Sequence, residues 1–113
     1  MIAGIGTDIA LISRFDKLTA GVERKIFTPF ELEEASGRAK RSEYLSSRFA
    51  AKEAYVKALG TGFGPVCASD IEIRNDEKGM PYILCRGIRD GRAHLSISHD
   101  GDYSVAFVVI ENE

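Results

Sequence analysis

The helix signal that decides the fold lies in residues 42–60, which read SEYLSSRFAAKEAYVKALG. Its large apolar side chains share one stripe at helical spacing: Leu45, Phe49, Val56 and Leu59. Gly60 follows at the position where a left-handed residue commonly ends a helix. We therefore expect one long helix over Ser42–Leu59.

Upstream of this helix, the sequence indicates one strand and one shorter helix. Residues 2–12 alternate and are rich in isoleucine, with Gly4 and Gly6 among them, which favours a buried strand. The residues Thr28-Pro29-Phe30-Glu31 combine a cap residue, a proline at the first helical position and a glutamate three residues after the cap. This pattern is typical of a helix N-terminus.

Downstream of residue 60 the apolar period changes to that of strands. Alternating or apolar runs occupy residues 70–74, 82–85, 94–98 and 103–110, and turn residues separate them at 75–79 and 100–102. We expect an antiparallel sheet of about four or five strands, packed against one long helix and shorter N-terminal helices. The fold class is thus α+β, with residues 1–113 as a single domain.

Composition excludes several classes of protein. The chain has 113 residues, of which 44% are hydrophobic and 28% charged, so neither disorder nor a fibre is indicated. It lacks an 18-residue apolar run and a secretion signal, so we expect no membrane span. The net charge of −2 argues against binding to a nucleic-acid backbone. Two cysteines, Cys67 and Cys85, are too few for a disulfide scaffold and favour a reducing cytoplasm.

Two carboxylates and one lysine are the first candidates for chemistry. Glu53 and Lys57 border the apolar stripe of the long helix, and they form either an ordinary surface pair or a cation ligand beside a phosphate-binding amine. Asp8 stands in an otherwise apolar strand, where it either caps a turn or marks the strand's end, or else shares Mg²⁺ with Glu53. The metal interpretation gains weight only with a phosphate substrate.

Other polar features have ordinary structural interpretations beside functional ones. The stretch Gly60-Thr-Gly-Phe-Gly64 follows a helix and is most simply its C-cap and turn, and residues 75–81 are most simply a hairpin loop. His94 is expected on the strand surface or in packing, whereas His99 ends a strand, where sites concentrate. The cluster of Arg38, Lys40 and Arg41 is either solvated or docks an acidic partner.

Several motifs occur together in a specific order: residues 6–9 (GTDI), 48–54 (RFAAKEA), 57–62 (KALGTG), 70–73 (DIEI), 79–81 (GMP) and 95–99 (LSISH). Together they resemble the holo-acyl-carrier-protein synthases, the small bacterial 4′-phosphopantetheinyl transferases. The resemblance runs from about residue 2 to residue 110, and residues 48–62 are its most specific part. The segment between Cys85 and His94 is shorter than in many members, which often carry a longer helix there.

The resemblance implies transfer of the 4′-phosphopantetheine group of coenzyme A to a serine of an acyl carrier protein, with release of adenosine 3′,5′-bisphosphate, in cytoplasmic fatty-acid biosynthesis. By position, Asp8 and Glu53 would hold Mg²⁺, and Lys57 would neutralise diphosphate oxygens. The base for the serine proton would be Glu53 or a metal-bound water. The coenzyme-contacting residues implied by the resemblance are Arg48, Lys57, Gly60, Gly62, Gly79, Pro81 and His99.

The resemblance also implies partners. Members of the small bacterial type are homotrimers with the site at the subunit boundary, which suits a chain too short for a deep pocket of its own. Acyl carrier proteins are acidic, and the basic residues expected to meet them are Arg14, Arg24, Lys40 and Arg41. The competing hypothesis is a non-enzymatic α+β module that binds an acidic protein.

Overall fold

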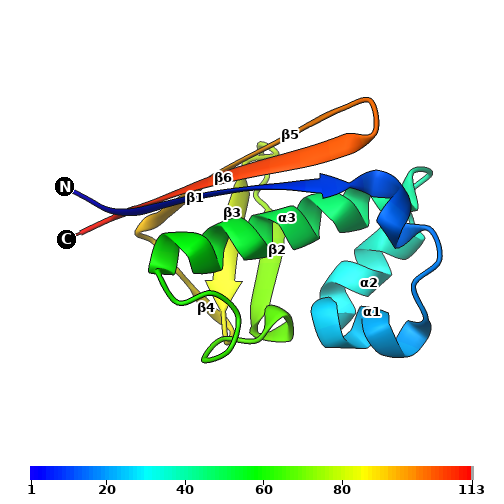
Figure 1. Ribbon diagram of the computed structural model, residues 1–113, viewed down its shortest axis with the longest axis horizontal. Coiled ribbons are helices and arrows are strands. Elements are labelled where there is room, and N and C mark those ends of the chain that lie inside the picture. The colour runs from blue at the N-terminus through cyan, green and yellow to red at the C-terminus, as the bar shows by residue number, and fades with distance from the viewer. Residues whose placement is uncertain (113) are drawn as a thin grey trace.

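The protein is described by a computed structural model that places residues 1–112. It is an α+β fold, as predicted, with helices on one side of a long three-stranded sheet (Figure 1). The elements in chain order are β1 (Ile2–Leu11), the 3₁₀ helix η1 (Ile12–Phe15), α1 (Ala20–Ile26), α2 (Pro29–Ser36), α3 (Arg41–Leu59), the 3₁₀ helix η2 (Ala68–Asp70), β2 (Ile71–Asn75), β3 (Pro81–Cys85), β4 (Ile88–Arg89), β5 (Ala93–Asp100) and β6 (Tyr103–Glu111).

The strands form two antiparallel sheets, so the expectation of a single sheet was wrong. The long sheet has the order β1-β6-β5, and a second sheet has the order β2-β3-β4. The short segment after Cys85 turns at Arg86 and Gly87, both with positive φ, and returns as the two-residue strand β4. In this second sheet β3 pairs with β2 along its length and with β4 at Leu84 and Cys85.

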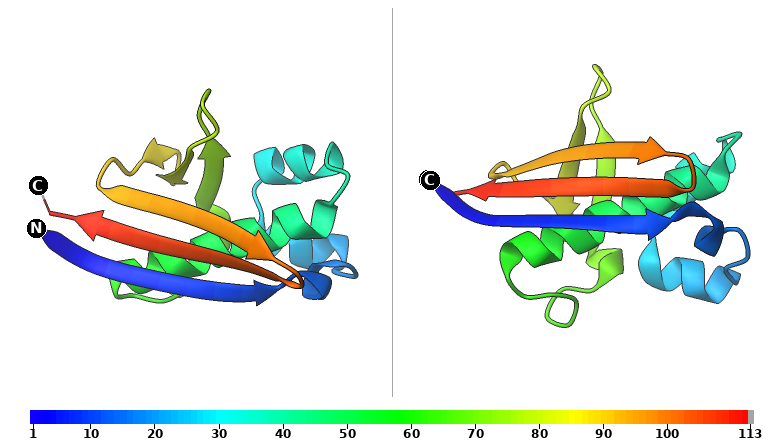
Figure 2. Two further views of the ribbon diagram at one scale, coloured as in Figure 1. Left: turned by 90° about the horizontal axis from the view of Figure 1, so that it is seen from above. Right: turned by 45° about the horizontal axis from the view of Figure 1, so that its top comes forward.

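Helix α3 lies along one face of the β1–β6–β5 sheet, and α1 and α2 gather beside its N-terminal end (Figure 2). The close approach of β1 to α3 requires two glycines. A Cβ atom on Gly4 would lie 1.9 Å from the carbonyl oxygen of Ala58, and one on Gly6 would lie 2.0 Å from that of Ala54. Any larger residue would therefore push the strand away from the helix.

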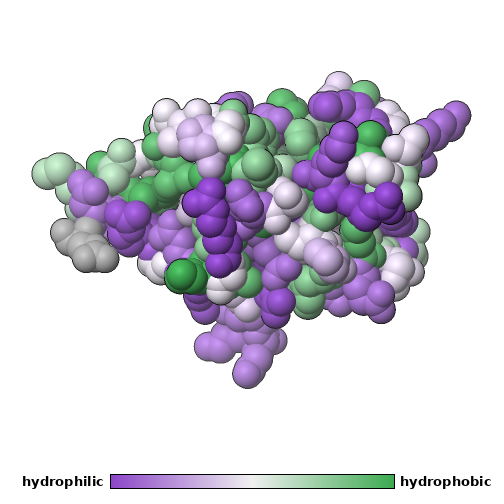
Figure 3. All heavy atoms as spheres, turned by 90° about the horizontal axis from the view of Figure 1, so that it is seen from below, coloured by the Kyte–Doolittle hydropathy of each residue, from purple (hydrophilic) through white to green (hydrophobic). Residues whose placement is uncertain are grey.

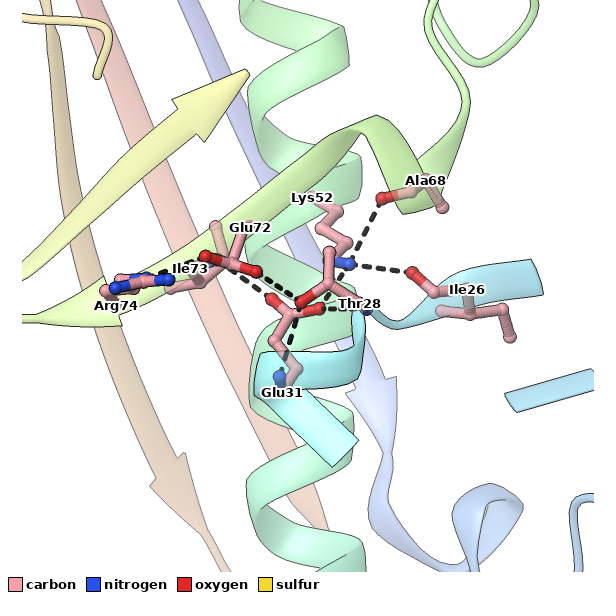
Figure 4. Close-up of polar contacts among 8 residues, drawn as sticks. All are labelled: Ile26, Thr28, Glu31, Lys52, Ala68, Glu72, Ile73 and Arg74. Atoms are coloured by element: carbon pink, nitrogen blue, oxygen red, sulfur yellow. Dashed lines mark hydrogen bonds and ion pairs between the residues drawn. The ribbon is translucent and has the colours of Figure 1, made fainter. Parts of the chain in front are cut away.

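A buried ion pair joins α3 to α2 and to the second sheet (Figure 4). Lys52 Nζ lies 2.6 Å from Glu31 Oε1 and also donates to the carbonyl oxygens of Ile26 and Ala68. Glu31 completes the predicted capping box with Thr28 and accepts from the backbone amide of Ile73. Both side chains are fully buried, so removing either partner alone should destabilise the fold by about 3–5 kcal/mol.

The sheet face turned away from α3 carries exposed apolar side chains. Ile5 and Ile9 of β1 are 60% and 61% exposed, and Phe107 of β6 is 47% exposed. On the opposite side of the molecule, hydrophilic and hydrophobic residues are interspersed (Figure 3). In the part of the chain that the structure describes, no helix is long and apolar enough to cross a membrane.

Candidate functional site

The first half of the candidate site is a polar cluster where β1 packs on α3. Asp8 lies inside β1 and faces the helix, not a turn. Lys57 Nζ donates to the carbonyl oxygen of Thr7 at 2.9 Å and lies 3.3 Å from Asp8 Oδ1. Among the described residues, Lys57 forms its ion pair with Asp8 and not with Glu53, so the simple surface pair along the helix was the wrong interpretation.

The electrostatics of this cluster favour a cation. Partial burial raises the pKa of the Glu53 carboxyl, and the neighbouring Asp8 carboxylate raises it further, while the charges of Lys57 and Arg14 oppose the shift. Two adjacent carboxylates repel each other, and a divalent ion between them removes that repulsion. The two side chains therefore fit the charge and hard oxygen donors that Mg²⁺ prefers.

The number of ligands also suits Mg²⁺ held jointly with a substrate. Within residues 1–112, no group of three or more His, Cys, Asp or Glu side chains is placed to hold a metal ion. Mg²⁺ is commonly bound by one or two carboxylates together with waters and substrate phosphates. The carboxylates of Asp8 and Glu53 match that pattern.

The second half of the candidate site is a groove of about 720 Å³ between the N-terminal part of α3, the β2–β3 turn and β5. Five of the predicted residues line it or its mouth: Lys40, Arg48, Gly79, Pro81 and His99. Arg38 and Lys78 add further positive charge to the groove. Glu43 adds one negative charge, and its Oε1 lies 3.5 Å from Nε2 of His99. The groove is thus predominantly cationic and suits an anionic ligand.

Arg48 is the most constrained cation of the groove. Its side chain is buried, with Nη2 donating to Asn75 Oδ1 at 2.6 Å and Nη1 to Ser47 Oγ at 3.2 Å. The guanidinium carbon lies 4.4 Å from the centre of the Tyr44 ring. Within the described residues, Arg48 Nε is a buried side-chain nitrogen with no hydrogen-bond partner. A buried donor of this kind is costly, and the guanidinium charge at the groove wall suits an anionic ligand.

The two halves lie at opposite edges of the long sheet. Asp8 belongs to the edge strand β1, whereas His99 and much of the groove wall belong to the other edge strand, β5. Two strand spacings, about 10 Å, separate these edges, and α3 lies against the sheet between Asp8 and the groove. The two halves are therefore separate features of the chain, one at each edge of the long sheet.

The remaining predicted residues have other surroundings. Gly60 is the left-handed C-cap of α3, with φ +81°, and the backbone amide of Gly62 donates to the carbonyl oxygen of Val56, so the ordinary interpretation of this stretch is confirmed. His94 lies on the surface 2.6 Å from Glu111. A role for either glycine in binding the coenzyme stays a prediction.

The predicted carrier-binding residues fall into three environments. Arg14 is the third residue of η1, and its guanidinium lies 5.7 Å from the ring centre of Phe49. Arg24 is exposed on α1, and Lys40 belongs to the groove. Arg41 forms two 2.8 Å hydrogen bonds with Glu23 of α1, so it is engaged within the chain.

Sequence reasoning missed Asn75 and Tyr44 as parts of the groove. Asn75 was assigned to a hairpin turn, but it ends β2 and contacts Arg48. Tyr44 is one helical turn before Arg48 on α3, and this spacing was the available signal for their contact.

Comparison with known proteins gives one consistent result. The family profile described as the 4′-phosphopantetheinyl transferase superfamily matches residues 4–108. A holo-[acyl-carrier-protein] synthase of Halothermothrix orenii is 44% identical, with 98% of each chain covered, and one of Geobacillus kaustophilus is 49% identical, covering 98% of this chain and 90% of the relative. The crystal structure of a holo-(acyl-carrier-protein) synthase from Bacillus anthracis in complex with CoA (3′,5′-ADP) superimposes with a TM-score of 0.88 at 42% identity, covering 100% of this chain and 99% of that one.

Proposed function

This chain belongs to the holo-[acyl-carrier-protein] synthases of the 4′-phosphopantetheinyl transferase superfamily, and from that membership we propose how its two half-sites work. It is an enzyme that transfers the 4′-phosphopantetheine group of coenzyme A to a serine hydroxyl of an acyl carrier protein. The observation that supports the mechanism is the carboxylate–lysine cluster at one sheet edge and the cationic groove at the other. Family membership removes the alternative of a non-enzymatic interaction module.

The reaction needs no nucleophile from this chain. The serine oxygen of the carrier forms a new bond to the phosphorus that bears pantetheine and gives up its proton to a base, for which Glu53 is the candidate in this chain. The bond from that phosphorus to the bridging diphosphate oxygen breaks, and adenosine 3′,5′-bisphosphate leaves. Positioning and charge neutralisation supply most of the rate enhancement in such transfers.

Each half-site has a defined share in that work. Asp8 and Glu53 would hold Mg²⁺, which when bound neutralises the coenzyme's diphosphate. Lys57, fixed by the Thr7 carbonyl and Asp8, presents its ammonium group to the same oxygens. Arg48 and the groove walls hold the nucleotide end of coenzyme A.

The separation of the halves supports a shared site between subunits. Coenzyme bound in the groove of one protomer would reach the carboxylates of a neighbour, in the homotrimer that we propose. The exposed Ile5, Ile9 and Phe107 on the outer sheet face give such an assembly an apolar surface to bury.

Mixing two inactive variants tests this arrangement. Arg48→Ala removes the groove cation and Glu53→Ala removes a carboxylate, so each homotrimer should lose most activity. After the two proteins are unfolded and refolded together, some interfaces would combine an intact groove with intact carboxylates, and activity should return. If the mixture is no more active than the separate variants, the shared site is wrong.

The carrier protein would approach over η1 and α1. Carriers of fatty-acid biosynthesis, the partners we propose, are acidic, and Arg14 and Arg24 offer positive charge on these elements. The positive charge of Arg14 also opposes the rise that burial causes in the pKa of Glu53, which supports carrier docking beside the carboxylates. We propose that residues 1–113 act as one transferase domain in the cytoplasm.

Binding of coenzyme A with and without Mg²⁺ tests the proposed substrate directly. Titration calorimetry should show tighter binding with Mg²⁺ than with a chelator, because the ion screens diphosphate from the two carboxylates. The Asp8→Asn variant, which lacks one negative charge, should show a much smaller Mg²⁺ effect. Equal affinity in both buffers for the unmodified protein would contradict the metal assignment.

A further inference from the structure

The turn between β2 and β3 is a self-contained unit that forms one wall of the groove. Asp76 Oδ1 accepts from the backbone amides of Lys78 and Met80, each at 2.9 Å, and the Asp76 amide donates to the Met80 carbonyl oxygen. Gly79 supplies the positive φ, +84°, that the turn requires. The turn therefore holds its own shape, and its place in the groove depends on what attaches it to the rest of the chain.

Asn75 attaches this turn to Arg48. Its Oδ1 accepts from Arg48 Nη2 at 2.6 Å, and its Nδ2 donates to the carbonyl oxygen of Gly79 at 2.9 Å. The side-chain amide is suited to this task because it carries an acceptor and a donor on one planar group. A single residue thus fixes both the groove cation and the groove wall.

The neutrality of Asn75 matters as much as its geometry. A carboxylate at this position would also accept from Arg48, but it would cancel the guanidinium charge and face the Gly79 carbonyl without a donor. Because the side-chain amide of Asn75 is neutral, it orients Arg48 without cancelling the positive charge of the guanidinium. The Nη1 and Nη2 atoms of Arg48 each donate one hydrogen bond within the chain, to Ser47 and Asn75, so a second N–H on each of these nitrogens remains for an anion.

We propose that Asn75 is a positioning residue for coenzyme binding, which orients Arg48 toward a phosphate of coenzyme A and couples it to the 76–80 turn. The inference rests on the proposed function, since it assigns the anion of the groove to the nucleotide end of that substrate. Asn75 acts through Arg48, so its effect appears in nucleotide affinity and not in the chemical step.

Calorimetry with adenosine 3′,5′-bisphosphate and with coenzyme A tests the proposal on the full chain. Asn75→Asp should weaken binding of both by about tenfold to a hundredfold, because a charge-assisted hydrogen bond contributes about 1.5–3 kcal/mol. Asn75→Ala, which releases both Arg48 and the turn without adding charge, should weaken binding in the same direction. The kcat at saturating coenzyme A should stay within about twofold, so that the loss appears in KM.

Asn112→Asp is the matched control, since Asn112 lies in the exposed C-terminal segment and the substitution adds the same charge. It should leave both dissociation constants unchanged. In an Arg48→Ala background, adding Asn75→Ala should cause a smaller further loss of affinity than Asn75→Ala causes alone, because only the attachment of the turn is then lost.

Three results would overturn the proposal: unchanged affinity in Asn75→Asp, an equal loss in Asn112→Asp, or full additivity with Arg48→Ala. A fall in kcat equal to the loss of affinity, together with a lower Tm, would show a merely structural residue and would overturn it as well. If the unmodified protein binds neither ligand, the failure belongs to the proposed function and not to Asn75.

Discussion

Gly6 sets the distance between the strand that carries Asp8 and the helix that carries Glu53, and Gly6→Ala tests whether that distance matters. The added Cβ would lie 2.0 Å from the Ala54 carbonyl oxygen and 2.8 Å from the Ala58 nitrogen. Both obstacles are helix backbone, which cannot rotate away as a side chain can. Restoring ordinary contact at 3.4 Å requires β1 to move from α3 by about 1.4 Å.

A displacement of this size has two expected consequences. Overpacking in a tight interface costs about 1–3 kcal/mol of stability. A misplacement of about 1 Å at a catalytic group lowers the rate by about a hundredfold. Because Asp8 is two residues from Gly6 on the same face of β1, we expect kcat/KM to fall by about a hundredfold and the Mg²⁺ concentration for half-maximal activity to rise.

Gly4→Ala separates catalysis from stability. Its Cβ would meet the Ala58 carbonyl oxygen at 1.9 Å, so the steric cost is the same, but Gly4 is four residues from Asp8 instead of two. Both variants should lose similar amounts of thermal stability, and only Gly6→Ala should change the Mg²⁺ dependence strongly. Equal losses of activity in the two variants, or near-normal activity of Gly6→Ala, would refute the positioning of Asp8 by Gly6.

Four further substitutions have expected outcomes. Asp8→Ala and Glu53→Ala should each lower the transfer rate about a hundredfold or more in a folded protein, measured at saturating Mg²⁺, and near-normal rates would contradict the metal assignment. Arg14→Glu should raise the KM for the carrier steeply while the affinity for coenzyme A stays unchanged. Added salt should reduce the difference in carrier KM between this variant and the unmodified protein, and a carrier KM that does not change with salt would exclude electrostatic docking. Arg41→Gln should lower Tm at neutral pH. Since Arg41 lowers the pKa of Glu23 below 4.5, the pair stabilises the fold fully above that pH and loses its effect as pH falls through the lowered pKa, so the two melting temperatures should converge in acid; a constant difference would contradict this.

Much of the fold was predictable because its signals are local. The cap at Thr28, the apolar stripe of α3 and the apolar run of β6 depend on residues close in sequence, and all three elements are present in the structure. The division into two sheets was not predictable, since it depends on β4, a strand of two residues that no periodicity reveals.

The site was predictable in composition but not in arrangement. Residue types and family motifs predicted Asp8, Glu53 and Arg48 as candidates, but no pattern indicated that the carboxylates and the groove would lie at different edges of the sheet. Lys52, next to Glu53, is fully buried and holds Glu31, although a lysine in a helix normally indicates a solvated face. Only the packing of α2 and η2 around it accounts for this.

The central claim is transfer of phosphopantetheine from coenzyme A to a carrier serine, and mass spectrometry of the carrier tests it most directly. An apo-acyl carrier protein is incubated with this protein, coenzyme A and Mg²⁺, beside reactions with Glu53→Ala or with a carrier that lacks the serine. We expect that only the complete reaction adds one phosphopantetheinyl group to the carrier and releases an equal amount of adenosine 3′,5′-bisphosphate. An unmodified carrier in the complete reaction, or modification of the carrier without its serine, would contradict the account.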